Sequence, residues 1–217
     1  MDQFQAIATT LSLTMGVAWA SGINLYAAIC TLGVLGATGN ITLPPDLMVL
    51  SEPVVIIAAG AMYLVEFVAD KIPGVDSGWD AVHTFIRIPA GALLAAGAVG
   101  DVSAPLAVAA GIMGGGMSAG SHAAKAGTRV MINASPEPFT NWLASLGEDV
   151  SVFVGLWAAL HHPLVFLVFI VIFILLLIWL LPKVWGAVKK LFSFIGRLFG
   201  GKDNHQPPAT AAGGTGE

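Results

Sequence analysis

The feature that most constrains this chain is an apolar run near its C-terminal end. Residues 164–181 read LVFLVFIVIFILLLIWLL and carry no charged or polar side chain. At about 1.5 Å per residue, an α-helix of this length extends roughly the thickness of the hydrocarbon core of a bilayer. The run therefore predicts a membrane-spanning helix and marks the chain as an integral membrane protein.

The composition of the whole chain agrees with several membrane segments. Of the 217 residues, 56% are hydrophobic and 10% are charged, which departs from the balance of soluble domains. A chain of this length has room for several spans but not for a sizeable soluble domain. We therefore predict an all-α polytopic bundle of about six to seven membrane segments, which occupies residues 1–182.

The first apolar segment, from Phe4 to Thr38, is interrupted by the sequence Ser21-Gly22-Ile23-Asn24. One straight helix over this segment would be longer than the bilayer is thick, and two halves of about sixteen residues would be short for spans. The sequence therefore predicts a broken helix or a re-entrant helical hairpin. Two short tilted spans joined by a tight turn fit equally well. Because a re-entrant first segment and a spanning one place the N-terminus on opposite sides, its side stays open.

The C-terminal part of the chain carries a separate charge signal. Five bases and no acid occur in residues 183–202, and positive residues beside a span favour the cytoplasmic side. In residues 183–199 the bases alternate with apolar side chains, as in amphipathic helices that lie on anionic lipid. We therefore expect a cytoplasmic C-terminus, an interfacial helix over 183–199 that contacts anionic lipid rather than nucleic acid, and a disordered tail over 200–217.

Ionisable residues recur at helical spacing through the middle of the chain. Asp76, Asp80, His83 and Arg87 are separated by 4, 3 and 4 residues, which places them on one narrow face of a helix. Three further strips have the same character: Tyr63, Glu66 and Asp70; His122, Lys125, Arg129 and Asn133; and Asn141, Ser145, Glu148 and Asp149. An ionised group near the bilayer midplane costs at least about 2.5 kcal/mol, so we expect the strips to face one another or water.

Two interpretations of the strips remain open. In the first, the acids pair with Lys71, Arg87, Lys125 and Arg129 only to fix the packing of the helices. In the second, the strips form a site that opens to the cytoplasm. A small anionic solute or a lipid headgroup would then bind Arg87, His122, Lys125, Arg129, Asn133 and Asn141. A coupling proton or cation would bind Glu66, Asp70, Asp80, Glu148 or Asp149.

The candidate functions follow from this choice. The leading prediction is a transport-type protein, and the alternative is a non-transporting membrane organiser. A third class is an intramembrane enzyme that acts on a phospholipid or isoprenoid phosphate, with His122 or His83 as the acid–base group. The sequence contains no phosphate-binding loop, nucleophile elbow or HExxH motif, and its single cysteine, Cys30, forms no thiolate cluster. We therefore expect no enzymatic activity, no cofactor and no metal centre.

Small residues indicate close packing of helices. Five glycines between residues 111 and 120 give overlapping small-xxx-small patterns, which let helix backbones approach and are compatible with a homo-oligomer. A weak internal repeat is also visible, because residues 58–62 read AAGAM and residues 109–113 read AAGIM. Each is followed by a charged cluster, a proline-containing turn and another apolar segment, as in duplicated helical hairpins.

The charged segments also form an ordered set of motifs. Residues 66–80 read EFVADKIPGVDSGWD, 84–91 read TFIRIPAG, 122–129 read HAAKAGTR, 133–138 read NASPEP and 145–149 read SLGED. In this order they resemble the membrane family catalogued as domain of unknown function 4126, over roughly residues 10–160. The resemblance implies a small multi-pass protein of the bacterial cytoplasmic (inner) membrane, and it brings no established activity. The last span and the basic tail lie outside the resemblance.

Overall fold

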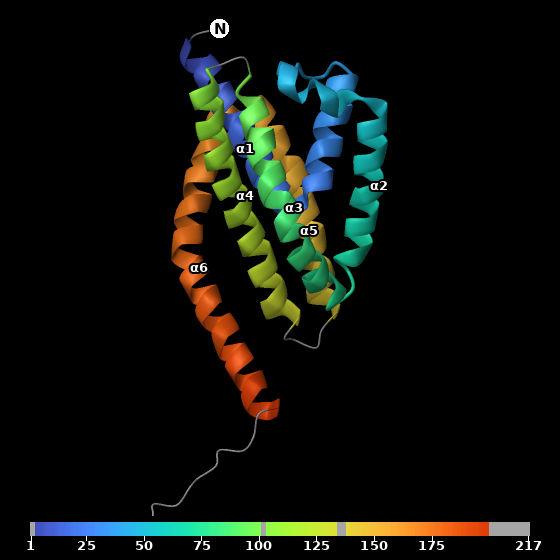
Figure 1. Cartoon of the computed structure of the whole chain (residues 1–217), viewed down its shortest axis with the longest axis vertical. Helices are drawn as coiled ribbons and strands as arrows, with labels where there is room; N and C mark the ends of the chain where they lie inside the picture. Colours follow the sequence, from blue (N-terminus) through green and yellow to red (C-terminus); the bar gives the residue numbers. More distant parts are fainter. Residues whose placement is uncertain (1–2, 101–102, 134–137, 200–217) are drawn as a thin grey trace, which may run out of the picture.

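The computed structural model of the protein describes residues 3–100, 103–133 and 138–199. In these ranges it consists of six α-helices and one short 3-10 helix, η1 (Figure 1). Their bounds are α1 Gln3–Ala37, η1 Pro45–Ser51, α2 Pro53–Ala69, α3 Val75–Ala98, α4 Ala104–Asn133, α5 Pro138–His161 and α6 Pro163–Phe199. The predicted all-α fold class is confirmed.

Within the described ranges, four helices are long and apolar enough to cross a membrane, namely α1, α3, α5 and α6. The pair η1–α2, bent by 68°, makes a fifth candidate if it counts as one span. The structure therefore offers four to five candidate spans by length and composition, against the six to seven segments that we predict. The prediction also counted α4, whose glycines and polar face leave it less apolar than the other helices.

Helix α1 is broken at Asn24, whose φ and ψ of −146° and 97° are not helical. The two limbs turn back on each other, so that both ends of α1 lie on the same side of the bundle (Figure 1). Contacts with α3 agree with this path. Leu11 lines a cavity with Val99 at the end of α3, and Gly97 packs against Leu47 of η1, the element that follows α1. The first segment is therefore a broken helix whose two limbs form a hairpin, an arrangement that fits both a re-entrant segment and two short tilted spans.

The break leaves backbone groups without helical partners, and polar side chains bind them. Asn24 Oδ1 accepts a hydrogen bond from the backbone N–H of Ala27, at 2.9 Å, and so caps the second limb. Lys125 Nζ of α4 donates to the carbonyl of Ile23, at 3.1 Å. Asn24 Nδ2 also donates to Asp149 Oδ1 of α5, at 3.1 Å. Irregular backbone is stable at membrane depth only when protein or water satisfies it in this way.

We expect Asn24→Ala to destabilise the fold by about 2 kcal/mol, because it removes the cap of the second limb and the donor to Asp149. Denaturant titration of the protein in detergent micelles measures the change. Asn40→Ala is the matched control, because Asn40 is exposed and its amide donates to the exposed Thr38. The control is expected to change stability by no more than about 0.5 kcal/mol, and equal effects of the two substitutions would contradict the role of Asn24.

Helix α1 lies in the middle of the bundle and contacts each of the other helices. Glycines allow the close approach: a Cβ on Gly114 of α4 would clash with Ala95 of α3, and a Cβ on Gly155 of α5 would clash with the ring of Trp19. Gly116 of α4, in contrast, faces open space. The glycine pattern of α4 therefore serves packing within the chain on one of its faces.

Helix α6 continues without a break from Pro163 to Phe199 and contains Pro182. The predicted span over 164–181 and the predicted interfacial helix over 183–199 are therefore parts of one helix. Lys183 Nζ lies 3.0 Å from the centroid of the Trp179 ring, a cation–π contact between residue types that anchor helices at membrane interfaces. The predicted disordered tail over 200–217 lies outside the described residues.

The hairpins α2–α3 and α4–α5 run in the same sense (Figure 1). In each, the first helix leads away from the side that holds both ends of α1, and the second helix returns to it. We refer to the opposite side, where α2 ends and α3 begins, as the turn side. The arrangement agrees with the internal repeat, although duplication of the two hairpins stays a prediction.

Candidate functional site

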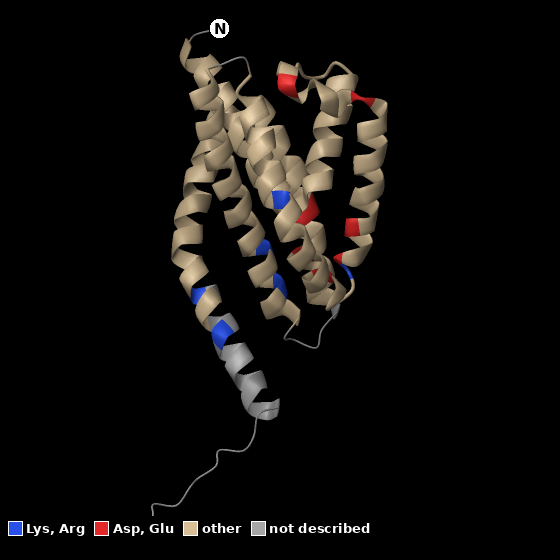
Figure 2. Ribbon diagram, viewed as in Figure 1, with Lys and Arg blue, Asp and Glu red and all other residues tan. Residues whose placement is uncertain are grey.

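Acids and bases from α2, α3, α4 and α5 pack together in the half of the bundle nearer the turn side (Figure 2). All of these side chains except that of Glu148 are buried. We refer to them as the charge cluster: Glu66, Asp70, Asp76, Asp80, Arg87, Lys125, Arg129, Glu148 and Asp149. The strips therefore face one another, as the cost of ionised groups in lipid requires.

Arg87 connects α2 and α3 to α4. Its Nη2 donates to Glu66 Oε1 at 2.5 Å, and its Nη1 donates to Asp80 Oδ1 at 2.9 Å and to His122 Nδ1 at 3.0 Å. Because a guanidinium only donates, the Nδ1 of His122 must be an acceptor and the ring is neutral. The proton on Nε2 then points to Thr84 Oγ1, at 2.7 Å. His122 is therefore a hydrogen-bonding bridge in this state and not a cation.

Lys125 occupies the middle of the cluster. Its Nζ lies 2.7 Å from Asp70 Oδ2, 3.3 Å from Glu66 Oε1 and 3.6 Å from Glu148 Oε2. The same ammonium group donates to the carbonyl of Ile23 at the break of α1. One base thus links the acids of α2 and α5 to the irregular backbone of α1.

Arg129 joins α4 to α5. It donates to Glu148 through Nε at 3.1 Å and through Nη2 at 2.6 Å, which is a bidentate pair. Its Nη1 donates to the carbonyl of Asp70 at 2.9 Å and to Asn141 Oδ1. One turn further along α4, Asn133 Nδ2 donates to both carboxylate oxygens of Asp76, at 2.8 and 2.9 Å.

Two titratable residues lie beside the cluster without pairing to its acids. His83 Nδ1 donates to the carbonyl of Trp79 at 2.9 Å, and its Nε2 accepts from the hydroxyl of Tyr26 at 3.1 Å. Lys71, in the turn after α2, donates to the carbonyl of Phe67 at 3.0 Å. Partial burial lowers the pKa of the Lys71 ammonium, although the nearby acids Asp149 and Asp70 oppose that shift.

The cluster has more acids than bases. Within the described residues, six carboxylates face the three bases Arg87, Lys125 and Arg129. Four buried carboxylate oxygens in the same part of the chain have no hydrogen-bond partner, namely Glu66 Oε2, Asp70 Oδ1, Asp80 Oδ2 and Asp149 Oδ2. An ionised carboxylate is ordinarily saturated with donors when it is buried. Within the described residues, the cluster therefore holds four buried carboxylate oxygens that can still accept a hydrogen bond.

The structure brings the predicted site residues into one region but gives them different partners. The predicted anion-binding residues Arg87, Lys125 and Arg129 are engaged by carboxylates, and Asn133 and Asn141 bind other members of the network. Asn24 and Asp76 were not among the predicted site residues. Asp76 shares the helical spacing of Asp80 and Arg87, and that spacing could have identified it as a site residue. No sequence pattern identifies Asn24, because it reaches Asp149 only through the path of α1. Whether these residues bind a ligand stays a prediction.

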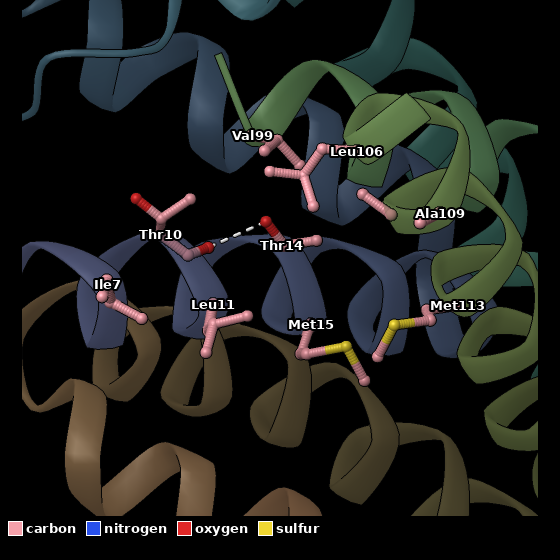
Figure 3. A pocket seen from close by; sticks show the side chains of 10 residues that line it. Ile7, Thr10, Leu11, Thr14, Met15, Val99, Leu106, Ala109 and Met113 are labelled. Atoms are coloured by element: carbon pink, nitrogen blue, oxygen red, sulfur yellow. Dashed lines mark hydrogen bonds between the residues drawn. The ribbon is translucent and has the colours of Figure 1, made fainter. Parts of the chain in front are cut away.

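A cavity of about 320 Å³ reaches the cluster between α1, α4, α5 and α6. Its polar lining comes from Ser121, Lys125, Thr128, Glu148 and Ser151. A larger cavity of about 410 Å³ lies between α1 and α4 on the other side of the bundle and is lined almost wholly by apolar side chains such as Leu11 and Met113 (Figure 3). Of these two cavities, the smaller is therefore the one that reaches the charge cluster.

Comparison with known proteins identifies a family and no further relative. Neither a curated protein nor a solved structure matches the chain. A family model matches residues 11–183, a range that contains the whole charge cluster. The match also includes the last apolar span, which the resemblance of the motifs left out. The chain therefore belongs to the family described as Domain of unknown function (DUF4126).

Proposed function

We propose that this membrane protein is a proton-coupled transporter of a small solute or lipid headgroup with an anionic group. The charge cluster is its coupling site. The observation that carries the proposal is the excess of acids described above: over the described residues, the charge cluster holds six carboxylates, five of them buried, against three bases, and it packs around a broken helix. Transport sites in membranes often lie at such interruptions, where half-helix ends and freed carbonyls meet charged groups.

Buried excess charge explains why protons would bind. An uncompensated ionised carboxylate in a low-dielectric interior costs several kcal/mol, and the group avoids this cost by taking up a proton. The number of protons held by the cluster then depends on the pH of the compartment to which it opens. A site of this kind converts a proton gradient into a change in its own net charge.

The pairing of the bases with carboxylates explains how binding of an anion would be coupled to binding of a proton. Each base is held by at least one carboxylate, so an anion can bind only if such a carboxylate is neutralised. Protonation of Glu148, for example, would remove the charge attraction within its bidentate pair with Arg129. Binding of the proton and binding of the anion would then favour each other by the same free energy. The arrangement supports transport of both in one direction.

The basic tail sets the proposed orientation. We place the C-terminus in the cytoplasm and the chain in the bacterial inner membrane, because bases beside the last span favour that side. The turn side and the adjacent charge cluster then lie toward the cytoplasm. Both ends of α1 lie toward the outer side, together with the junction between α5 and α6.

Transport can be tested in liposomes that contain the purified protein and a pH indicator in the lumen. Inorganic phosphate, succinate and glycerol 3-phosphate are the probe anions, each added outside at lower pH. We expect one of them to accelerate acidification of the lumen, and Arg129→Gln to reduce that rate by about tenfold or more. Lys183→Gln is the control for loss of a base outside the cluster. A wild-type rate in folded Arg129→Gln protein would refute the assignment.

A second candidate function is a membrane organiser in which the ion pairs only hold helices together, and the complete pairing of the bases supports it. Exchange of Arg87 and Asp80, as Arg87→Asp with Asp80→Arg, separates the two functions. An organiser is expected to recover folding and cellular function together. A transporter is expected to recover folding alone, because the positions of base and acid relative to the cavity are reversed. The third class, an enzyme, has less support because both ring nitrogens of His122 are already engaged.

A further inference from the structure

Glu148 differs from the other acids of the charge cluster in its access to the cavity. Its side chain is 17% exposed, whereas those of Glu66, Asp70 and Asp80 are 0–3% exposed. Glu148 and Lys125 both line the cavity of about 320 Å³. A proton that arrives in this cavity therefore meets the Glu148 carboxylate before the deeper acids.

Glu148 also has a direct connection to those deeper acids. Its Oε2 lies 3.6 Å from Lys125 Nζ, and the same Nζ lies 2.7 Å from Asp70 Oδ2. The other carboxylate oxygen of Asp70 has no hydrogen-bond partner among the described residues. Lys125 is thus placed between a carboxylate that faces the cavity and a buried carboxylate that is free to hold a proton.

We propose that Glu148 is the entrance for protons to the charge cluster and that Lys125 relays them to Asp70. This assignment rests on the proposed function, in which protonation of the cluster drives transport. A hydronium ion that reaches the cavity gives a proton to the Glu148 carboxylate and leaves as water. The Lys125 ammonium gives a proton to Asp70 and takes one back from Glu148, so that Lys125 begins and ends as an ammonium. The net result is a neutral Asp70 and an ionised Glu148.

The groups around Glu148 fit this role. Arg129 and Lys125 of α4 face it, Asp70 approaches from α2 through Lys125, and Asp149 follows it on α5. When Glu148 is protonated, Arg129 keeps its hydrogen bonds to the carbonyl of Asp70 and to Asn141. The guanidinium therefore stays in place while its attraction to α5 weakens. Few contacts join α4 to α5, so this pair is suited to open and close the cavity.

Substitutions of the two relay residues test the proposal directly. Protein in nanodiscs is mixed rapidly with buffer of lower pH, and a pH indicator reports the number of protons taken up and the rate. Glu148→Gln removes the entrance, and Lys125→Arg keeps the positive charge but cannot pass a proton on. We expect both to slow proton uptake by about tenfold or more. Glu52→Gln, an exposed acid outside the cluster, is the control and is expected to keep the wild-type rate.

A second experiment leaves the relay residues unchanged. Gly147 lines the cavity, and a Cβ added to it meets no other atom, so Gly147→Cys is expected to fold. Gly116→Cys is the matched control, because Gly116 also faces open space and does not line this cavity. Both are made with Cys30→Ser, which removes the native thiol. Modification with a bulky methanethiosulfonate is expected to slow proton uptake in the Gly147→Cys protein and not in the control.

The outcomes separate this inference from the proposed function. If the wild-type protein takes up protons and both the Glu148→Gln and the modified Gly147→Cys proteins keep its rate, protons enter elsewhere, and the assignment of the charge cluster as the coupling site still stands. If the wild-type protein takes up no protons when the pH falls, the assignment of the charge cluster as the coupling site is itself wrong. Slow uptake in Lys125→Arg together with a wild-type rate in Glu148→Gln would overturn the assignment of Glu148.

Discussion

Arg87→Ala is expected to lower the free energy of unfolding by about 3–5 kcal/mol, more than removal of any exposed charge. The guanidinium is fully buried and donates to two carboxylates, Glu66 and Asp80, that are themselves buried. Its loss leaves Lys125, at 3.3 Å from Glu66 and 3.6 Å from Asp80, to serve both acids, and it leaves His122 Nδ1 without its donor. The expected cost arises mainly from the stranded charges and less from the lost attraction.

A combined variant tests that cause. Arg87→Ala with Glu66→Gln and Asp80→Asn removes the base and neutralises both acids, so it is expected to regain much of the lost stability. Unfolding of the purified proteins in detergent, followed by circular dichroism, measures each variant. Lys183→Ala is the control, because Lys183 is exposed, and is expected to change stability by no more than about 0.5 kcal/mol. A combined variant as unstable as Arg87→Ala would show that stranded charge is not the main cost.

Helical spacing was sufficient to predict which charged residues share a face. Asp76, Asp80, His83 and Arg87 recur every three or four residues, and the structure buries all four side chains on one side of α3. The physical reason is general, because lipid penalises a charged face that has no partner. The sequence therefore predicted the inward direction of the strips.

The sequence did not determine which acid meets which base. Lys71 was expected to pair with an acid, yet its ammonium donates to the carbonyl of Phe67 and to Ser145. Asp149 instead receives its hydrogen bond from Asn24, which is 125 residues away along the chain. Such pairs depend on the order of helices around the bundle. Helical periodicity carries no information about that order.

The path of the first segment was open for a related reason. The polar sequence around Asn24 indicates where the helix breaks but not the angle between its two limbs. That angle depends on distant groups, because Lys125 binds the freed carbonyl of Ile23.

Gly22→Ala is expected to destabilise the fold by about 3 kcal/mol, at the upper end of the cost of overpacking. A Cβ on Gly22 would clash with the Oγ of Ser121 and with the backbone carbonyl of Ser118. A hydroxyl can rotate away, but a helix backbone cannot, so α1 and α4 must separate. Gly116→Ala is the matched control, because its Cβ meets no other atom, and is expected to stabilise α4 by about 0.5–1 kcal/mol.

The effect of Gly22→Ala is expected to reach the charge cluster as well. Ile23 is the next residue, and its carbonyl is bound by Lys125, which also contacts Asp70 and Glu66. Separation of α1 from α4 therefore lengthens the contact that ties the central base to the break. The rate of proton uptake by the folded protein in nanodiscs, reported by the pH indicator, is expected to fall in Gly22→Ala and not in Gly116→Ala. Loss of stability with unchanged uptake would show that the break of α1 and the charge cluster are independent, and that Lys125 keeps its position without the Ile23 carbonyl.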